Sequence, residues 1–277
     1  VRVRDEGRQW SDWASPRFFE TGMMGQFRWK GKWITDTYDI NLKPAAYFRR
    51  VFKAGKNIES ARVYIAAAGL YELSINGERV GDHRLDPNYT RFDRRTLYVT
   101  YDVTNYLQQG DNAVGVLLGN GWYNHQSTAV WYFDQAPWRA RPKFCLDLHV
   151  TYTDGTKEVI ATDERWRTSH SPVIFNSIYT AEHYDARKEQ PGWDTPGFKA
   201  EGWRGIHTTG APSNNIVAQA LHPIRNVKEY RPVSLTRIDD RTWLYDFGQN
   251  MSGITRVKVN GPEGTTVRLK HVERLDS

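Results

Sequence analysis

The sequence predicts an all-β protein of the jelly-roll or β-sandwich class. Short runs in which apolar and polar residues alternate recur along the 277 residues, and a period of two is that of a strand with one buried face. Asn-Gly and Asp-Gly pairs separate several of these runs, as in tight hairpins. Helical periodicity is nearly absent, because its best candidate is the short turn at 103–109, which Gly110 stops.

The expected strands follow one another in hairpin order. Residues 61–66 and 70–75 are alternating runs, and Asn76-Gly77 ends the second of them. Both turn residues tolerate a positive φ, as a type I′ turn requires. The same arrangement recurs at 143–162 around Asp154-Gly155 and at 255–271 around Asn260-Gly261, and further strands are expected at 47–53, 96–103 and 112–118.

Changes in composition divide the chain into three parts. Residues 1–29 are interpreted as the end of a preceding β domain, with Trp10 and Trp13 in its core. Residues 30–215 supply most of the strand signals and are expected to form the main sandwich. The Gly-, Pro-, Ser- and Asn-rich stretch at 210–215 is typical of a linker. Residues 216–277 are therefore expected to begin a second, smaller or incomplete sandwich.

Composition and charge argue against several functional classes. With 39% hydrophobic and 25% charged residues the chain is typical of a globular protein. Its net charge is +6, but Lys and Arg alternate with Asp and Glu instead of forming the stripe of a nucleic-acid interface. No apolar run approaches the roughly 18–20 residues of a membrane-spanning helix, and no signal peptide is recognisable. Cys145, the single cysteine, is interpreted as a buried small hydrophobe.

The aromatic content is high, at 13% with 11 Trp and 15 Tyr. Aromatic rings pack in cores, but their faces also suit the apolar C–H face of a sugar ring. The most informative candidate for that second use is Leu118-Gly-Asn-Gly-Trp-Tyr-Asn124, where a strand runs into glycines and then aromatic residues. Glycine permits a sharp bend and a close approach of backbones there. A phosphate-binding loop is not expected, because Gly119-Asn-Gly121 opens no helix.

Several motifs, taken in order, resemble the bacterial α-L-rhamnosidases of glycoside hydrolase family 78. They are Gly69-Leu-Tyr-Glu-Leu-Ser-Ile-Asn-Gly77, Leu85-Asp-Pro-Asn-Tyr-Thr90, Tyr101-Asp-Val-Thr104, Gly119-Asn-Gly-Trp-Tyr123, Tyr184-Asp-Ala-Arg187 with Gly192-Trp-Asp194, and Asp246-Phe-Gly-Gln-Asn250. The resemblance implies a galactose-binding-like sandwich at 30–215. It also implies the end of a fibronectin type III-like domain at 1–29 and the start of another sandwich at 216–277.

The same resemblance implies an inverting glycosidase that releases terminal L-rhamnose. In that family the catalytic carboxylates lie in a C-terminal (α/α)6 barrel, and no helical repeat of that kind occurs in this sequence. We therefore assign no catalytic residue and expect an ancillary segment whose partners are that barrel, in the same protein, and a rhamnose-containing carbohydrate. A secreted or periplasmic location is implied by the resemblance alone.

In some members of that family the matching sandwich binds L-rhamnose with the help of calcium, an ion that takes oxygen ligands from Asp, Asn and backbone carbonyls, and the resemblance implies the same use here. The calcium candidates are Asn76, Asp86 and Asn88, and the sugar candidates are Asn120, Trp122, Tyr123 and Asn124, with Trp122 stacking on the ring. No other cofactor is expected.

Local structural roles compete with these assignments. Asn76 suits the I′ turn by itself, Asp86-Pro87 is common turn chemistry, and Trp122 has packing against a neighbouring domain as its alternative. Asp185 and Arg187 are interpreted as a structural ion pair or a clamp on an adjoining domain. At the level of the whole chain, a stand-alone carbohydrate-binding module and a structural sandwich without a ligand remain the alternatives.

Overall fold

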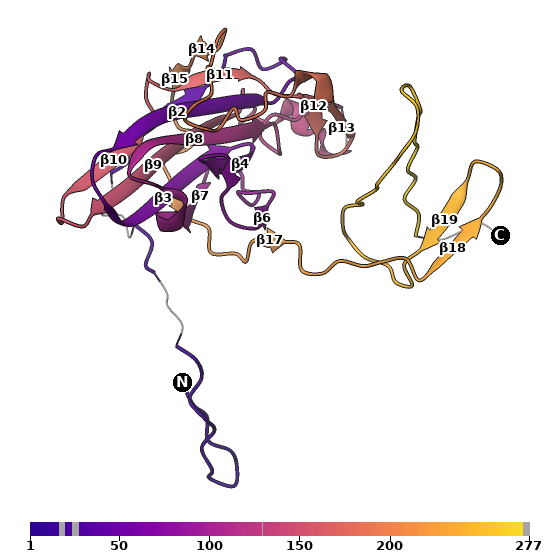
Figure 1. The fold of residues 1–277 in the computed structure, drawn as a ribbon, viewed down its shortest axis with the longest axis horizontal. Coiled ribbons are helices and arrows are strands. Elements are labelled where there is room, and N and C mark those ends of the chain that lie inside the picture. The colour runs from indigo at the N-terminus through magenta and orange to yellow at the C-terminus, as the bar shows by residue number, and fades with distance from the viewer. Residues whose placement is uncertain (17–19, 24–27, 129, 274–277) are drawn as a thin grey trace. The chain divides into compact units, whose positions relative to one another are not determined.

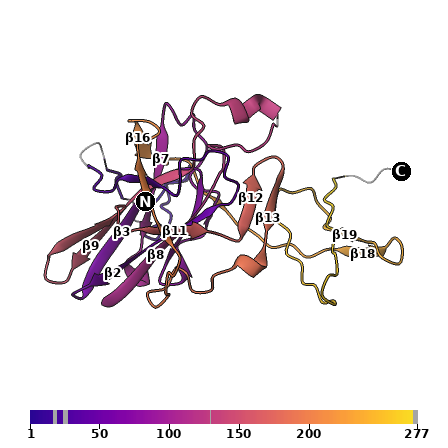
Figure 2. The same ribbon diagram turned by 90° about the horizontal axis from the view of Figure 1, so that it is seen from above.

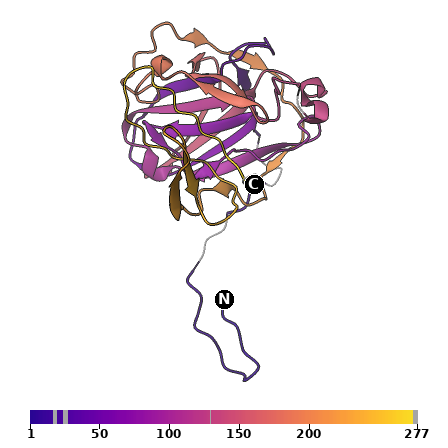
Figure 3. The ribbon, with the colours of Figure 1, turned by 90° about the vertical axis from the view of Figure 1, so that its right-hand side faces the viewer.

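The all-β prediction is confirmed by a computed structural model, which describes residues 1–16, 20–23, 28–128 and 130–273. Within these residues the helical segments are three short 3-10 turns, Thr104–Tyr106 (η1), Val130–Gln135 (η2) and Ala186–Lys188 (η3). They lie at the edges of the sandwich (Figure 3). The chain divides into two compact units, 1–225 and 226–277.

Two largely antiparallel sheets pack against each other in the first unit (Figures 1 and 2). The seven-stranded sheet has the order β15-β1-β9-β3-β7-β16, with β10 paired to β9, and β16 joins β7 in parallel. Its strands are β1 (Trp33–Thr35), β3 (Ile58–Ala68), β7 (Thr96–Asp102), β9 (Lys143–Tyr152), β10 (Lys157–Ala161), β15 (His207–Thr209) and β16 (Ile216–Ala218).

The six-stranded sheet has the order β14-β11-β2-β8-β4-β5. Its strands are β2 (Ala46–Ala54), β4 (Leu70–Ile75), β5 (Glu78–Arg79), β8 (Gly110–Gly119), β11 (Arg167–His170) and β14 (Arg204–Gly205). Two short pairs complete the unit, namely β6 (His83–Arg84) with β17 (Ile224–Arg225) and β12 (Val173–Ser177) with β13 (Ala181–Tyr184).

Two of the three predicted hairpin turns form where the sequence placed them. Asn76 and Gly77 both adopt positive φ, 54° and 83°, between β4 and β5. Gly155, with φ of 80°, turns the chain between β9 and β10. Asn-Gly and Asp-Gly therefore set the register of neighbouring strands, as turn chemistry requires.

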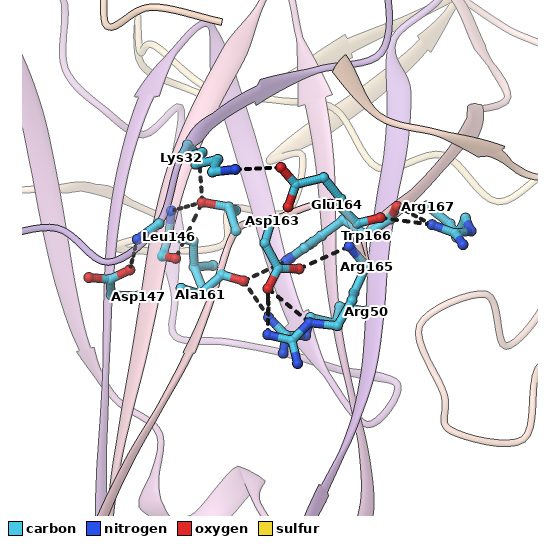
Figure 4. Close-up of polar contacts among 12 residues, drawn as sticks. Lys32, Arg50, Leu146, Asp147, Ala161, Asp163, Glu164, Arg165, Trp166 and Arg167 are labelled. Carbon is cyan, nitrogen blue, oxygen red and sulfur yellow. Dashed lines mark hydrogen bonds and ion pairs between the residues drawn. The ribbon is translucent and has the colours of Figure 1, made fainter. Parts of the chain in front are cut away.

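The core lies between the two sheets and is closed by aromatic rings. Phe144 of β9 contacts Phe48 of β2 edge-to-face at 5.1 Å between ring centroids, and Trp166 at 5.5 Å. The Trp166 indole N–H donates to the carbonyl of Ala161 at 3.0 Å. Arg50, on β2, donates to the same carbonyl and to Asp163 (Figure 4). This network ties one sheet to the end of β10 in the other.

A segment at 190–205 covers the outer face of the six-stranded sheet. Trp193 stacks on Tyr47 at 4.1 Å between centroids and lies nearly parallel to Trp203. Arg49 donates to the carbonyls of Trp193 and Thr195 at 2.7 and 2.8 Å. The Gly192-Trp-Asp194 motif therefore has a packing role.

Residues 226–277 form the second unit, in which β18 (Ser234–Arg237) pairs with β19 (Trp243–Asp246). The strands predicted at 255–259 and 265–271 are not formed in this structure. Val257 and Leu269, in those segments, are 45% and 53% exposed. Alternation alone does not make a strand, because the backbone needs a partner and one face needs cover.

The structure describes only part of the predicted segment 1–29, since residues 17–19 and 24–27 lie outside the described residues. Trp10 and Trp13 are 53% and 69% exposed, and the guanidinium of Arg2 lies 4.4 and 4.8 Å from their rings. Their place in the core of a preceding domain stays a prediction. No helix within the described ranges is long and apolar enough to cross a membrane.

Candidate carbohydrate-binding loops

Aromatic side chains from three loops meet around Trp122. Its ring centroid lies 5.2 Å from Tyr179, in the β12–β13 turn, and 5.3 Å from Phe133 of η2. Tyr89, from the loop after β6, lies 5.5 Å away. Tyr89 and Tyr179 are 46% and 42% exposed. These four rings are called the Trp122 cluster below.

Glycines let the 119–124 loop lie tightly against the junction of β3 and β4. A Cβ on Gly69, which has φ of +129°, would lie 2.4 Å from the carbonyl oxygen of Gly119. A Cβ on Gly121, with φ of +51°, would lie 2.8 Å from Leu70 Cγ. Both backbones can approach this closely only without a side chain. The Gly-Asn-Gly sequence is explained by this contact.

Two of the sugar candidates, Asn120 and Asn124, hold the loop together. Both are buried. The backbone N–H of Asn120 donates to Asn176 Oδ1 at 2.6 Å, and its side-chain amide donates to the Asn176 carbonyl at 3.1 Å. Asn124 donates to Ile40 O at 3.0 Å and accepts from Arg139 Nε at 3.0 Å. Their hydrogen-bonding groups are largely used by the protein itself.

The other two sugar candidates differ in exposure. Tyr123 is buried and contacts Phe92 at 5.1 Å between centroids. Burial raises the pKa of its phenol well above the ordinary value of 10.0. Trp122 is half-buried and lies within the Trp122 cluster. Of the four predicted residues, Trp122 alone keeps part of its side chain at the surface.

The three calcium candidates do not come together. Asp86 bridges Tyr71 near the start of β4, whereas Asn76 follows the end of that strand. At about 3.3 Å per residue, five residues of strand separate them by roughly 16 Å, far beyond the ~2.5 Å of a calcium–oxygen bond. No group of three or more His, Cys, Asp or Glu able to hold a metal occurs in the described part of the chain. Calcium stays a prediction without a ligand set.

Asn76 and Asp86 have local roles instead. The Asn76 amide donates to Tyr106 O and Asn112 Oδ1 at 2.9 and 2.8 Å, and its oxygen accepts from the Ala113 N–H. The buried Asp86 carboxylate accepts from the Tyr101 hydroxyl at 2.8 Å and lies 2.6 Å from His83 Nδ1. Gln219 joins this group, donating to Asp86 and accepting from the Asn88 N–H.

Polar atoms that the sequence did not single out lie beside the Trp122 cluster. His125 Nδ1, Asp134 Oδ1 and Asn176 Nδ2 are buried and have no hydrogen-bond partner among the described residues. His125 is fully buried, and its ring contacts Tyr179 at 5.6 Å and Phe133 at 6.5 Å. Desolvation lowers the pKa of this imidazole, and the negative charge of Asp134 partly offsets that shift. Buried polar atoms are rarely left unpaired, so this end of the sandwich has capacity for a polar ligand.

Comparison with known proteins decides the family. Residues 56–228 match the family model of the α-L-rhamnosidase N-terminal domain, and 236–277 match the bacterial α-L-rhamnosidase concanavalin-like domain. The chain belongs to the α-L-rhamnosidase N-terminal domain family. The resemblance inferred from the ordered motifs is thereby confirmed.

Relatives of this rhamnosidase domain are much longer than the chain. An α-L-rhamnosidase of Formosa agariphila is 33% identical over 99% of the chain but only 31% of its own length. One from Streptomyces avermitilis is 39% identical over 80% of the chain and 21% of its own length. The chain thus spans about a third, or less, of these relatives.

Solved structures agree with the fold of the rhamnosidase domain. An α-L-rhamnosidase from Dictyoglumus thermophilum is 38% identical, with a TM-score of 0.75, over 90% of this chain and 29% of its own. That from Streptomyces avermitilis, complexed with L-rhamnose, is 35% identical, with a TM-score of 0.69, over 76% of this chain and 20% of its own.

The motifs that signalled the rhamnosidase family have structural roles where the structure describes them. Arg187 Nε lies 2.8 Å from Asp185 Oδ1, with the Arg187 side chain 89% exposed, so the predicted ion pair exists at the surface. Tyr184 donates to Glu189 at 2.6 Å.

Proposed function

We propose that this chain is a non-catalytic segment of an α-L-rhamnosidase that hydrolyses terminal α-L-rhamnose from glycosides or polysaccharides. The main support is that the two α-L-rhamnosidase family models match along the chain, whereas the chain spans only 31% of the length of a related α-L-rhamnosidase. Apart from strands, the regular structure of the described residues consists of three 3-10 turns. In this proposal, the (α/α)6 catalytic barrel lies in the part of the protein outside this chain.

The nucleotide sequence downstream of the Ser277 codon tests this proposal. Several hundred codons with helical periodicity and acidic motifs are expected. A stop codon directly after Ser277 would favour a stand-alone carbohydrate-binding module or a structural sandwich instead.

We further propose that the Trp122 cluster binds L-rhamnose-containing carbohydrate. Its aromatic rings can pack against the apolar face of a sugar, and the unpaired atoms of His125, Asp134 and Asn176 can bond to hydroxyls. A relative from Streptomyces avermitilis was solved with L-rhamnose, which supports the choice of sugar.

A calorimetric titration of residues 1–277 with L-rhamnose, with calcium and then with a chelator, tests the binding. Heat of binding is expected, and Trp122→Ala should weaken the binding. Trp243→Ala, which removes a 48% exposed ring from the second unit, is the matched control and should bind as the wild type does. Circular dichroism confirms that each variant is folded. Absence of heat in folded wild type, with or without calcium, would leave the structural sandwich as the better account.

A further inference from the structure

Two consecutive aromatic residues, Trp131 and Tyr132, are presented to solvent on η2. Trp131 is 74% exposed and Tyr132 is 67% exposed. Neither ring contacts another aromatic ring among the described residues, although Phe133, the next residue, contacts Trp122, Tyr89 and Trp138. The turn therefore places one ring inside the Trp122 cluster and leaves two outside it.

The backbone of these two residues is strained. Trp131 and Tyr132 have φ of 74° and 51°. For side chains with a Cβ the left-handed region costs free energy, and bulky residues seldom adopt it. Strain of this kind persists only where the surroundings fix it.

Contacts after the strained residues hold the turn in place. The N–H of Ala136 donates to Phe133 O at 3.2 Å, and Arg139 Nη1 donates to Asp134 O at 3.1 Å. Arg139 also bonds Asn124, so η2 is fastened to the 119–124 loop. The same two residues thus combine a strained backbone with exposed apolar rings. Neither feature stabilises the fold of the described residues.

We infer that Trp131 and Tyr132 form a second stacking platform, which contacts the sugar residue next to the one held by the Trp122 cluster. This inference rests on the proposed carbohydrate binding. We assign the platform to a separate subsite because Phe133 contacts Trp122, whereas Trp131 and Tyr132 contact no aromatic ring among the described residues. The substrate class is then an oligosaccharide or polysaccharide chain, in preference to a lone rhamnosyl group.

Titration of residues 1–277 with L-rhamnose and with a linear α-L-rhamnose trisaccharide tests the platform. The double variant Trp131→Ala/Tyr132→Ala should bind the trisaccharide about fivefold more weakly, the scale of a lost aromatic contact, and should bind L-rhamnose as the wild type does. Trp122→Ala should weaken both ligands, and Trp243→Ala should weaken neither.

The outcomes separate the two proposals. If wild type binds both sugars and the double variant binds the trisaccharide equally well, the platform is overturned and the Trp122 proposal stands. Equal losses for both ligands also overturn it, since the rings would then serve the first sugar. If wild type binds neither sugar, both proposals fail. Unchanged sugar affinities with a lower melting temperature of the full-length gene product would make the two rings a contact with another domain, against this inference.

Discussion

Arg141 and Asp36 form a two-pronged ion pair that is almost completely buried. Arg141 Nε and Nη2 each lie 2.8 Å from a separate Asp36 oxygen, and the two side chains are 4% and 2% exposed. Arg141 also donates to the carbonyls of Leu42 and Pro44 at 2.8 and 2.7 Å. The pair thereby fixes the loop that leads from β1 to β2 against the start of β9.

Arg141→Ala should lower the free energy of unfolding by about 3–5 kcal/mol, because it leaves a buried carboxylate without its counter-charge. Urea denaturation measures the change. Arg187→Ala is the control, since it removes an ion pair whose arginine is 89% exposed, and it should stay close to wild-type stability. Similar losses for both variants would contradict the assigned role of Arg141.

Gly69→Ala should destabilise the sandwich by about 2–4 kcal/mol, since overpacking adds to the cost of a positive φ. The added Cβ would meet the Gly119 carbonyl oxygen at 2.4 Å. Gly155→Ala is the control, because Gly155 also has a positive φ but its Cβ would meet nothing within 4 Å; it should cost about 1–2 kcal/mol. Equal melting temperatures for the two variants would show that the approach of Gly69 to the Gly119 carbonyl is not tight.

Acidification should weaken the fold through His125. Burial lowers the pKa of this imidazole from 6.5, so the unfolded chain takes up a proton before the folded one does. The stabilisation is complete above pH 6.5 and is lost as pH falls toward the lower folded-state pKa. The pKa of His170 is lowered as well, so the measurement compares a variant with the wild type. The melting temperature of His125→Phe should fall less than that of the wild type between pH 7.5 and pH 5. An identical pH dependence would argue against a neutral, buried His125.

Gly115→Ala should loosen the 190–205 segment. A Cβ there would lie 2.7 Å from Trp193 Cη2 and 2.8 Å from Asp194 Cβ. Limited proteolysis with mass spectrometry is expected to show faster cleavage within 190–205. Gly197→Ala, whose Cβ would meet nothing within 4 Å, should be cleaved as wild type is. Wild-type protection of Gly115→Ala would mean that Trp193 does not depend on this glycine.

Hairpins were predictable because their information is local. Asn76-Gly77 needs only its own two residues to favour a I′ turn, and the alternating runs on either side give the buried face of each strand. The strands expected at 255–271 failed for the opposite reason. Their alternation is equally regular, but a strand is stabilised by neighbours that this segment lacks in the described structure.

The candidate site was only partly predictable. Trp122 was found from its glycine-aromatic setting, yet its ring partners Tyr89, Phe133 and Tyr179 come from separate loops, and no short-range pattern connects them. Asn120 and Asn124 have the residue type of a sugar ligand but are used inside the loop. Asn76 and Asp86 are ten residues apart in sequence. Asn76 follows the end of β4, whereas Asp86 pairs with Tyr71 near its start, so the two residues lie at opposite ends of this strand. His125 gave no signal, since its significance comes from burial.

The most direct test of the central claim is an assay of L-rhamnose release from 4-nitrophenyl α-L-rhamnoside by two purified proteins, residues 1–277 and the full-length gene product. The account predicts release by the full-length product and none by the chain of residues 1–277, folded as judged by circular dichroism. Comparable release by residues 1–277 alone, or none by a folded full-length product, would contradict the claim that this chain is a non-catalytic segment of an α-L-rhamnosidase.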